Sequence, residues 1–303
     1  MRWKLQARDV ALIMLTLATT AAGPLVPSAN GAPSREPEPV VRGIVTKRAL
    51  AADPDLQYFL YVPRRVGPGA PVFVSVHGIS RNAREHADRF APFAEAEGVV
   101  LVAPRFSRTR FPDYQRLGRE GGDGRADLAL ARILDEVGSL TGANVQRVSL
   151  FGFSGGGQFV HRFAMVHPQR VEAYVVGSAG WYTFPDAEAR YPYGTRGMER
   201  VFGEPFDVQA FLSIPATVVV GERDVHPGTA LRKTRRVEDA QGATRYERGQ
   251  RWVAAMNKAA AATGLSAQVR FIPLARSPHS FAKAMRRGDM GQKVFDSLYW
   301  AAH

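Results

Sequence analysis

The chain has 303 residues, 45% hydrophobic and 22% charged, which is typical of a globular protein with one sizeable core and excludes disordered and fibrous classes. It contains no cysteine, so cysteine proteases, thiol redox enzymes and thiolate metal sites are excluded as well. The formal charge of +12 comes mainly from scattered arginines without a nucleic-acid-binding motif, and we expect no nucleic acid partner.

The first segment, residues 1–32, has the layout of an export signal. Three basic residues precede the apolar run Val10–Ala22, and small residues and prolines follow as far as Ala32. This run is too short to span a bilayer comfortably. We therefore predict a cleaved signal peptide and leader, and a periplasmic or secreted protein without stable membrane insertion after cleavage. An uncleaved anchor and a buried helix are the alternatives.

Residues 40–303 are predicted to form a single α/β domain. The β-prone runs Gly43–Leu50 and Gln57–Val62 indicate an antiparallel hairpin, after which apolar strands alternate with helices. The expected strands are 72–76, 99–103, 145–151, 171–176, 216–220 and 268–273, and the expected helices are 82–97, Asp123 or Asp127 to Leu140, 155–167, 246–263 and 281 to the end. This alternation predicts a mostly parallel sheet covered by helices on both faces.

A loop rich in arginine, glycine and aromatic residues runs over residues 104–122. Within it, Phe106 is a candidate substrate contact, and its neighbours include Arg105, Arg108 and Arg110. These arginines would attract an anionic substrate, although solvated loop residues of this kind are also common.

The segment 181–211 is aromatic and irregular, and we interpret it as a small cap or a pocket-lining insertion. It begins with Trp181 and Tyr182, directly beyond a predicted strand. Ligands of parallel sheets bind beyond the carboxyl ends of the strands. The two rings therefore either line an acyl or aromatic pocket or form the core of the cap.

The strongest motif is Gly-x-Ser-x-Gly, centred on Ser154 between a predicted strand and a predicted helix. At such a turn the serine takes a strained backbone conformation that only small neighbours tolerate, and Gly152, Gly155 and Gly156 leave that room. The result is an exposed hydroxyl at the start of a helix. We predict that Ser154 is a nucleophile; a serine that merely caps the helix is the alternative.

A serine nucleophile needs a base and a carboxylate that orients the base. Of the seven histidines, only His279 follows the last predicted strand, on a loop at the expected active edge. Asp224 and Glu222 both follow the preceding strand, and we prefer Asp224 because it lies further into the loop. His226, two residues beyond Asp224, receives no role.

Acyl transfer also needs hydrogen-bond donors directed at the developing oxyanion. The sequence Ser75-Val76-His77-Gly78-Ile79 ends an early strand at the same edge of the sheet. We predict that the backbone N–H groups of Ile79 and Gly155 form the oxyanion hole. His77 is interpreted as a residue that shapes this turn, not as a base.

The order Ser154, Asp224, His279, together with the elbow and the His77-Gly78 turn, resembles the α/β-hydrolase superfamily over roughly residues 57–281. More narrowly, the chain is similar to exported esterases of the polyhydroxybutyrate-depolymerase and feruloyl-esterase kind, although Ile79 stands where that branch often has cysteine. The resemblance implies hydrolysis of small or polymeric esters through an acyl-enzyme, without metal or organic cofactor. A peptidase or amidase of the same fold and a non-catalytic binding protein on this scaffold are the alternatives.

Overall fold

The computed structural model of the chain describes residues 39–119, 121–122, 124–226, 228, 231–266 and 269–299. The predicted signal peptide and leader over residues 1–32 lie outside this described part. None of the described helices is long and apolar enough to cross a membrane.

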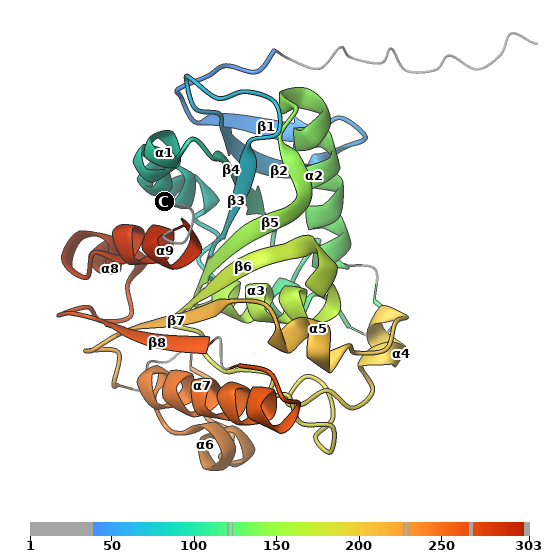
Figure 1. The fold of residues 1–303 in the computed structure, drawn as a ribbon, viewed down its shortest axis with the longest axis vertical. Helices are drawn as coiled ribbons and strands as arrows, with labels where there is room; N and C mark the ends of the chain where they lie inside the picture. The colour runs from blue at the N-terminus through green and yellow to red at the C-terminus, as the bar shows by residue number, and fades with distance from the viewer. Residues whose placement is uncertain are drawn as a thin grey trace, which may run out of the picture. The chain divides into compact units, whose positions relative to one another are not determined.

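A single sheet of eight strands, in the order β1-β2-β4-β3-β5-β6-β7-β8, organises the described residues (Figure 1). The strands are β1 Thr46–Leu50, β2 Asp53–Tyr61, β3 Pro71–Val76, β4 Val100–Arg105, β5 Asn144–Phe153, β6 Val171–Gly177, β7 Ala216–Gly221 and β8 Val269–Leu274. β2 is antiparallel to both β1 and β4, and every pairing from β4 to β8 is parallel. The predicted hairpin and the mostly parallel sheet are confirmed.

Helices cover both faces of this sheet, as predicted. The longer helices are α1 Ala83–Glu97, α2 Ala126–Thr141, α3 Gly155–Val166, α7 Arg245–Ala262, α8 Phe281–Arg287 and α9 Met290–Tyr299. In Figure 1, α1, α8 and α9 lie on one face and α2, α3 and α7 on the other. The two groups of helices also supply two separate clusters of buried apolar side chains.

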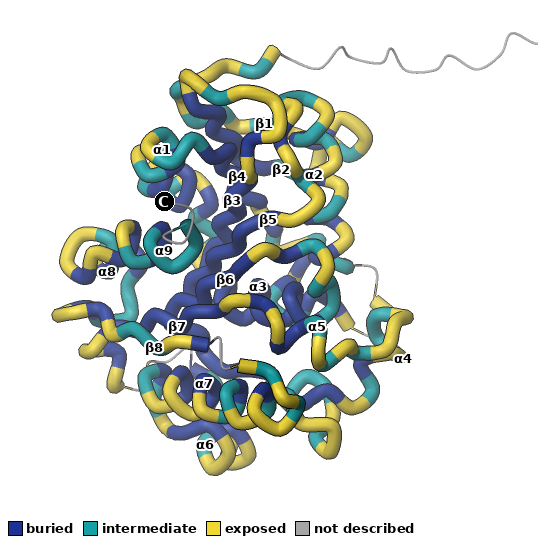
Figure 2. The backbone as a smooth tube through the Cα atoms, in the orientation of Figure 1, coloured by how far each residue is buried: buried dark blue, intermediate teal, exposed yellow. Residues whose placement is uncertain are grey.

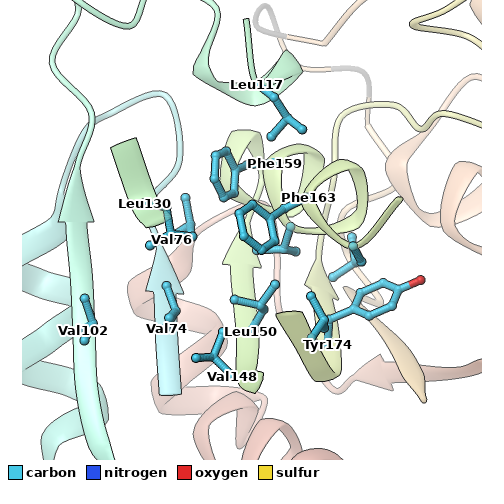
Figure 3. Packing of buried hydrophobic residues seen from close by; sticks show 14 of the residues in the cluster. Val74, Val76, Val102, Leu117, Leu130, Val148, Leu150, Phe159, Phe163 and Tyr174 are labelled. Carbon is cyan, nitrogen blue, oxygen red and sulfur yellow. The ribbon is translucent and has the colours of Figure 1, made fainter. Parts of the chain in front are cut away.

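The core follows the two-residue period of a strand. In β3, Val72, Val74 and Val76 join the cluster beneath α2, α3 and α7, whereas Phe73 joins the cluster beneath α1 and α9. Figure 2 shows the central strands buried along their length. Figure 3 shows the α3 ring of Phe159 packed over this layer. Burial on both faces explains why these strands read as continuous apolar runs.

Two local predictions are wrong, and one helix was not predicted. α2 begins at Ala126, and Asp127 does not cap it: its carboxylate lies in the first turn and binds Arg125 and His167 instead. The single helix expected from residue 281 onward is divided into α8 and α9, with Asp289 at a φ of 51° between them. The helix α6, Arg235–Gln241, was not expected. Asp123, the other predicted cap, lies outside the described residues.

The segment 181–211 contains two short helices, α4 Met198–Phe202 and α5 Val208–Leu212, and is otherwise irregular. A short 3-10 turn, η1 Tyr114–Arg116, lies in the arginine-rich loop that follows β4. Another, η2 Pro168–Arg170, links α3 to β6. The segment and the η1 turn lie near each other, because Tyr191 donates a hydrogen bond to the carbonyl of Arg116 at 2.7 Å.

Candidate active site

Ser154 occupies a sharp turn between β5 and α3, with φ 56° and ψ −110°. Its N–H donates to the carbonyl of Gly177 at 2.7 Å, which ties the turn to the neighbouring strand β6. A Cβ atom on Gly152 would collide with the carbonyl of Gly156, and one on Gly156 with the carbonyl of Val76. Glycine is therefore required at both positions, and the backbone strain at Ser154 is held by its surroundings.

Ser154, His279 and Asp224 come together at the carboxyl ends of β5, β8 and β7. The Nε2 atom of His279 lies 3.1 Å from the Ser154 Oγ, and its Nδ1 lies 2.8 Å from the Asp224 Oδ2. An ionised carboxylate only accepts, so Nδ1 carries the proton and Nε2 presents a lone pair to the hydroxyl. This arrangement can remove the proton from Ser154.

The loops after β7 and β8 interlock, and this fixes Asp224 relative to His279. The N–H of Glu222 donates to Leu274, and the N–H of Arg223 donates to Ser277, both at 3.0 Å. Glu222, the rival carboxylate, points elsewhere: its Oε2 accepts from the N–H of Arg276 at 3.2 Å. Only Asp224, of the two candidates, reaches the imidazole.

Arg245, the first residue of α7, binds the same buried carboxylate. Its Nη1 donates to the Asp224 Oδ1 at 3.2 Å, and both side chains are almost fully buried. His279 and Arg245 thus use different oxygens of Asp224, which leaves the carboxylate little freedom to rotate. Sequence reasoning missed this contact, because nothing in the helix pattern of α7 marks its first residue as a partner of a distant loop.

The predicted oxyanion donors are the N–H groups of Ile79 and of Gly155, the residue that follows Ser154. Neither amide has a hydrogen-bond acceptor among the described residues. The two residues are neighbours in space, since a Cβ on Gly155 would lie 3.2 Å from the Ile79 Cγ2. Both donors are therefore free to bind a charged oxygen that forms next to Ser154.

His77 holds the turn that carries the Ile79 amide. Its Nε2 accepts from the Phe106 N–H at 3.1 Å, so the proton is on Nδ1, which donates to the Gly78 carbonyl at 2.8 Å. A trans peptide directs its N–H opposite to its C=O, so fixing the Gly78 carbonyl also fixes the Ile79 N–H. Burial lowers the pKa of His77 to about 4, which keeps this ring neutral at pH 7.

Tyr114, which sequence reasoning did not single out, packs against this turn. Its hydroxyl donates to the His77 carbonyl at 2.9 Å and would collide with a Cβ on Gly155. Its ring also lies under the guanidinium of Arg81, at 4.2 Å. The sequence alone does not indicate that a loop tyrosine packs against the turn at His77.

Two of the three predicted substrate contacts are buried in the core. Phe106 and Tyr182 have no exposed surface: Phe106 packs on Tyr114 and Phe159, and Tyr182 stacks on Trp252. Neither ring can touch a substrate in this conformation, because core packing already covers both faces. Trp181 is 5% exposed and lies among arginine side chains.

The arginines of the loop after β4 do not gather at the triad. Arg110 forms a two-pronged ion pair with Asp53, and Arg105 donates to Gln57 at 2.7 Å, whereas Arg108 is exposed. These contacts border a pocket of about 300 Å³ that no triad residue lines. His226, which had no predicted role, is exposed. Among the described residues, no group of acidic residues and histidines is arranged to hold a metal ion.

The sequence resembles one curated protein over part of its length. No protein-family model matches the chain. The bifunctional acetylxylan esterase/xylanase of Neocallimastix patriciarum is 26% identical over 148 residues, which cover 48% of this chain and 21% of that protein. The chain thus spans about a fifth of the length of this relative.

Solved structures are similar over most of the chain. The poly(aspartic acid) hydrolase-1 of Sphingomonas sp. KT-1 is 27% identical with a TM-score of 0.69, covering 79% of this chain and 93% of its own. The poly(3-hydroxybutyrate) depolymerase of Bordetella parapertussis is 28% identical with a TM-score of 0.66, covering 82% and 84%. A hyperthermophilic esterase of Pyrobaculum calidifontis, 16% identical with a TM-score of 0.54 over 87% of this chain and 85% of its own, shares the fold.

Strand order, the turn at Ser154 and these similarities together define the α/β-hydrolase fold. The predicted fold is confirmed, and so is the predicted likeness to polyhydroxybutyrate depolymerases. Fold alone does not choose a reaction, so the activity has to be argued from the site.

Proposed function

We propose that this protein is a serine carboxylic-ester hydrolase that works through an acyl-enzyme. The observation that carries the proposal is the pair of consecutive hydrogen bonds that links Asp224 to His279 and His279 to the Oγ of Ser154. The N–H groups of Ile79 and Gly155 have no acceptor within the described part of the chain and can stabilise an oxyanion by hydrogen bonding. The similarity to esterases and depolymerases supports the same reaction class.

In the first half of the reaction, the Ser154 Oγ attacks the ester carbonyl carbon while its proton passes to Nε2 of His279. The carbonyl oxygen becomes an oxyanion and accepts from the N–H groups of Ile79 and Gly155. Asp224 keeps the imidazolium oriented through Nδ1. When the C–O bond to the alcohol breaks, Nε2 returns the proton to the leaving oxygen, and the acyl group stays on Ser154.

In the second half, water takes the place of the alcohol. Nε2 of His279 removes a proton from the water as its oxygen attacks the acyl carbon, and the same donors stabilise the new oxyanion. The bond to the Ser154 Oγ then breaks, the proton returns to that oxygen, and the carboxylic acid leaves. No group outside the chain is consumed except the ester and water.

The proposal is tested with a short p-nitrophenyl ester and two serine variants. Ser154→Ala should abolish turnover while the circular dichroism spectrum and melting temperature stay close to those of the wild type. Ser139→Ala, on the exposed side of α2, is the matched control and should keep full activity. Turnover that survives in folded Ser154→Ala protein would contradict the proposal.

Amide hydrolysis is the second candidate reaction. It is favoured by the similarity to a poly(aspartic acid) hydrolase, since a chain of amino acids is joined by amide bonds. The same triad cleaves both bond types, and the difference lies in how well a poor amine leaving group is protonated. Matched ester and peptide substrates, assayed side by side, decide which reaction has the larger kcat/KM.

A binding protein that has kept the hydrolase scaffold is the remaining alternative. A fluorophosphonate probe separates it from an enzyme, because the probe reacts only with an activated serine. Adduct formation at Ser154 would support the enzyme, and inertness of folded protein would support a binder.

We further propose that the protein is exported after cleavage within residues 1–32. The basic, apolar and small-residue regions of this segment come in the order that an export signal requires. N-terminal sequencing of the protein from culture medium or periplasm tests this, and an intact Met1 in the mature protein would contradict it.

A further inference from the structure

Three arginines lie around one indole ring, that of Trp181. The guanidinium carbons of Arg162, Arg232 and Arg116 lie 4.3, 5.4 and 5.7 Å from the centre of the Trp181 ring. Arg232 also donates to the hydroxyl of Tyr193 at 2.8 Å. We call Arg116, Arg162, Arg232 and Trp181 the arginine cluster. Cation–π contact with the Trp181 ring lowers the free-energy cost of burying a guanidinium group, but it does not neutralise the three positive charges of the cluster.

None of these three arginines has a carboxylate partner among the described residues. Each one leaves a buried nitrogen without a hydrogen-bond acceptor: Nε of Arg116, Nη2 of Arg162 and Nε of Arg232. Arg162 is completely buried, and its remaining nitrogens bind only neutral oxygens, those of Thr183, Gln115 and Gln158. Burial therefore lowers the pKa of Arg162 to about 10.

Among the described residues, Arg125, Arg245 and Arg248 are neutralised or fully bonded, whereas Arg81 also has an unpaired buried Nε and no carboxylate partner. Arg125 forms an ion pair with Asp127, and Arg245 forms one with Asp224. Arg248 is buried without a carboxylate, but each of its three side-chain nitrogens donates to a backbone carbonyl. The arginine cluster thus differs from Arg125, Arg245 and Arg248 in having both uncompensated charge and spare donors, and from Arg81 in having three such guanidinium groups at one ring.

The cluster lies on the nucleophile's side of the sheet. Arg162 is two turns after Ser154 on α3, and its Nη1 reaches back to the carbonyl of Gln158, which is one turn, about 6 Å, from Ser154 along the helix. Arg116 comes two residues after Tyr114, the side chain that contacts the turn of the oxyanion donors. Arg116, Arg232 and Tyr193 are half-buried, so parts of these side chains reach solvent, although the three unpaired nitrogens are buried.

We propose that the arginine cluster is a subsite for a carboxylate group carried by the substrate. Each guanidinium group has an N–H donor without an acceptor in the described part of the chain, and a planar carboxylate can accept two such donors at once. This proposal rests on the proposed function and specifies its substrate class: esters that bear a free carboxylate a few bonds from the scissile carbonyl.

The first test uses p-nitrophenyl monoesters of linear dicarboxylic acids, each paired with the same compound whose distal carboxylate is methylated. Dicarboxylic acids of about four to ten carbons span the distance between Ser154 and Arg162, which are about two turns apart on α3. In the wild type, kcat/KM of the free acid should exceed that of its methyl ester at the length that fits. Arg232→Gln and Arg116→Gln should each lower this ratio about tenfold, the effect of one charge-assisted hydrogen bond.

Arg190→Gln is the matched control, because Arg190 is exposed in the same segment and outside the cluster. It should leave the ratio unchanged. A wild-type enzyme that hydrolyses the methyl esters as well as the free acids, with ratios unaffected in Arg232→Gln and Arg116→Gln, would overturn the carboxylate subsite and leave the esterase proposal intact.

The second test does not depend on turnover. Suberate, a linear dicarboxylate, is titrated calorimetrically into Ser154→Ala protein, and binding should weaken about tenfold when Arg232→Gln is added. Saturable binding that is lost in this way would support the subsite even if no ester were hydrolysed, in which case only the proposed function would fail. Absence of suberate binding to Ser154→Ala would contradict the subsite.

Discussion

Two histidines follow strands at the same edge of the sheet, yet their surroundings differ. His77, after β3, has no exposed surface, and both of its ring nitrogens are held by backbone groups. His279, in the loop after β8, has 29% of its side chain exposed, and its nitrogens face a carboxylate and a hydroxyl. The same residue type therefore has two different environments at one edge of the sheet.

The difference shows what a histidine needs in order to transfer protons. His77 binds backbone groups whose protons do not move, and burial keeps its pKa near 4, so it stays in one tautomer and fixes a turn. His279 sits between a negative charge, which stabilises its protonated form, and a hydroxyl that can lose a proton. Accordingly, we expect the two histidines to respond differently to substitution.

The largest effect should come from His279→Ala. Without the base, Ser154 stays protonated during attack, and the members of such a triad act as a unit. Hydrolysis of a p-nitrophenyl ester should fall about a thousandfold or more in kcat/KM. The melting temperature should change little, because the side chain lies partly in solvent. A loss of only a fewfold would show that another group acts as the base.

A smaller loss should follow His77→Leu, which keeps the volume of the ring but releases the Gly78 carbonyl. The Ile79 amide would then be less firmly directed at the oxyanion, and kcat should fall by about tenfold to a hundredfold with KM nearly unchanged. His77→Gln is the matched variant: it can still accept from the Phe106 N–H and should restore part of kcat. Equal losses in KM and kcat for both variants would indicate a general structural defect instead.

The smallest effect concerns stability in mild acid. His77, His86 and His161 are all buried, and burial holds the pKa of each below its usual value of 6.5. A base with a depressed pKa contributes its full stability above the unfolded value and loses it as the pH falls toward the folded value. His77 alone should lower the free energy of unfolding by about 1 kcal/mol between pH 6.5 and about pH 5.5.

Urea unfolding across this pH range measures the slope of the free energy of unfolding against pH. His86→Gln should make it shallower, because one buried group that must stay neutral has been removed. A free energy of unfolding that stays constant or rises on acidification would contradict this view of the buried histidines.

Most of the fold could be predicted from the sequence, because a buried parallel sheet leaves a simple signal. Every predicted strand appears in the structure, since each is a short apolar run between turn residues. Helix ends were harder to predict. Aspartate is a common N-cap residue, which made Asp127 a candidate. Its carboxylate instead binds His167, which is distant in sequence. Contacts of that kind are tertiary and leave no local pattern.

The site residues also fall into two groups: those that a sequence pattern marks and those that no pattern marks. Ser154 and the glycines around it are marked by the local geometry of the turn, and His279 and Asp224 by their order after consecutive strands. Arg245 and Tyr114 reach the site from a helix start and a loop, where no spacing rule applies. For Phe106 and Tyr182 the sequence does not separate a pocket from a core, because aromatic side chains in irregular segments suit both equally well.

The most direct test of the central claim is fluorophosphonate labelling followed by peptide mass spectrometry. In the wild type we predict one adduct, on Ser154, and a labelling rate that falls about a thousandfold in His279→Ala but far less in His77→Leu. An adduct on any other residue, or equal labelling rates in the wild type and His279→Ala, would contradict the assignment of Ser154 and His279 as nucleophile and base.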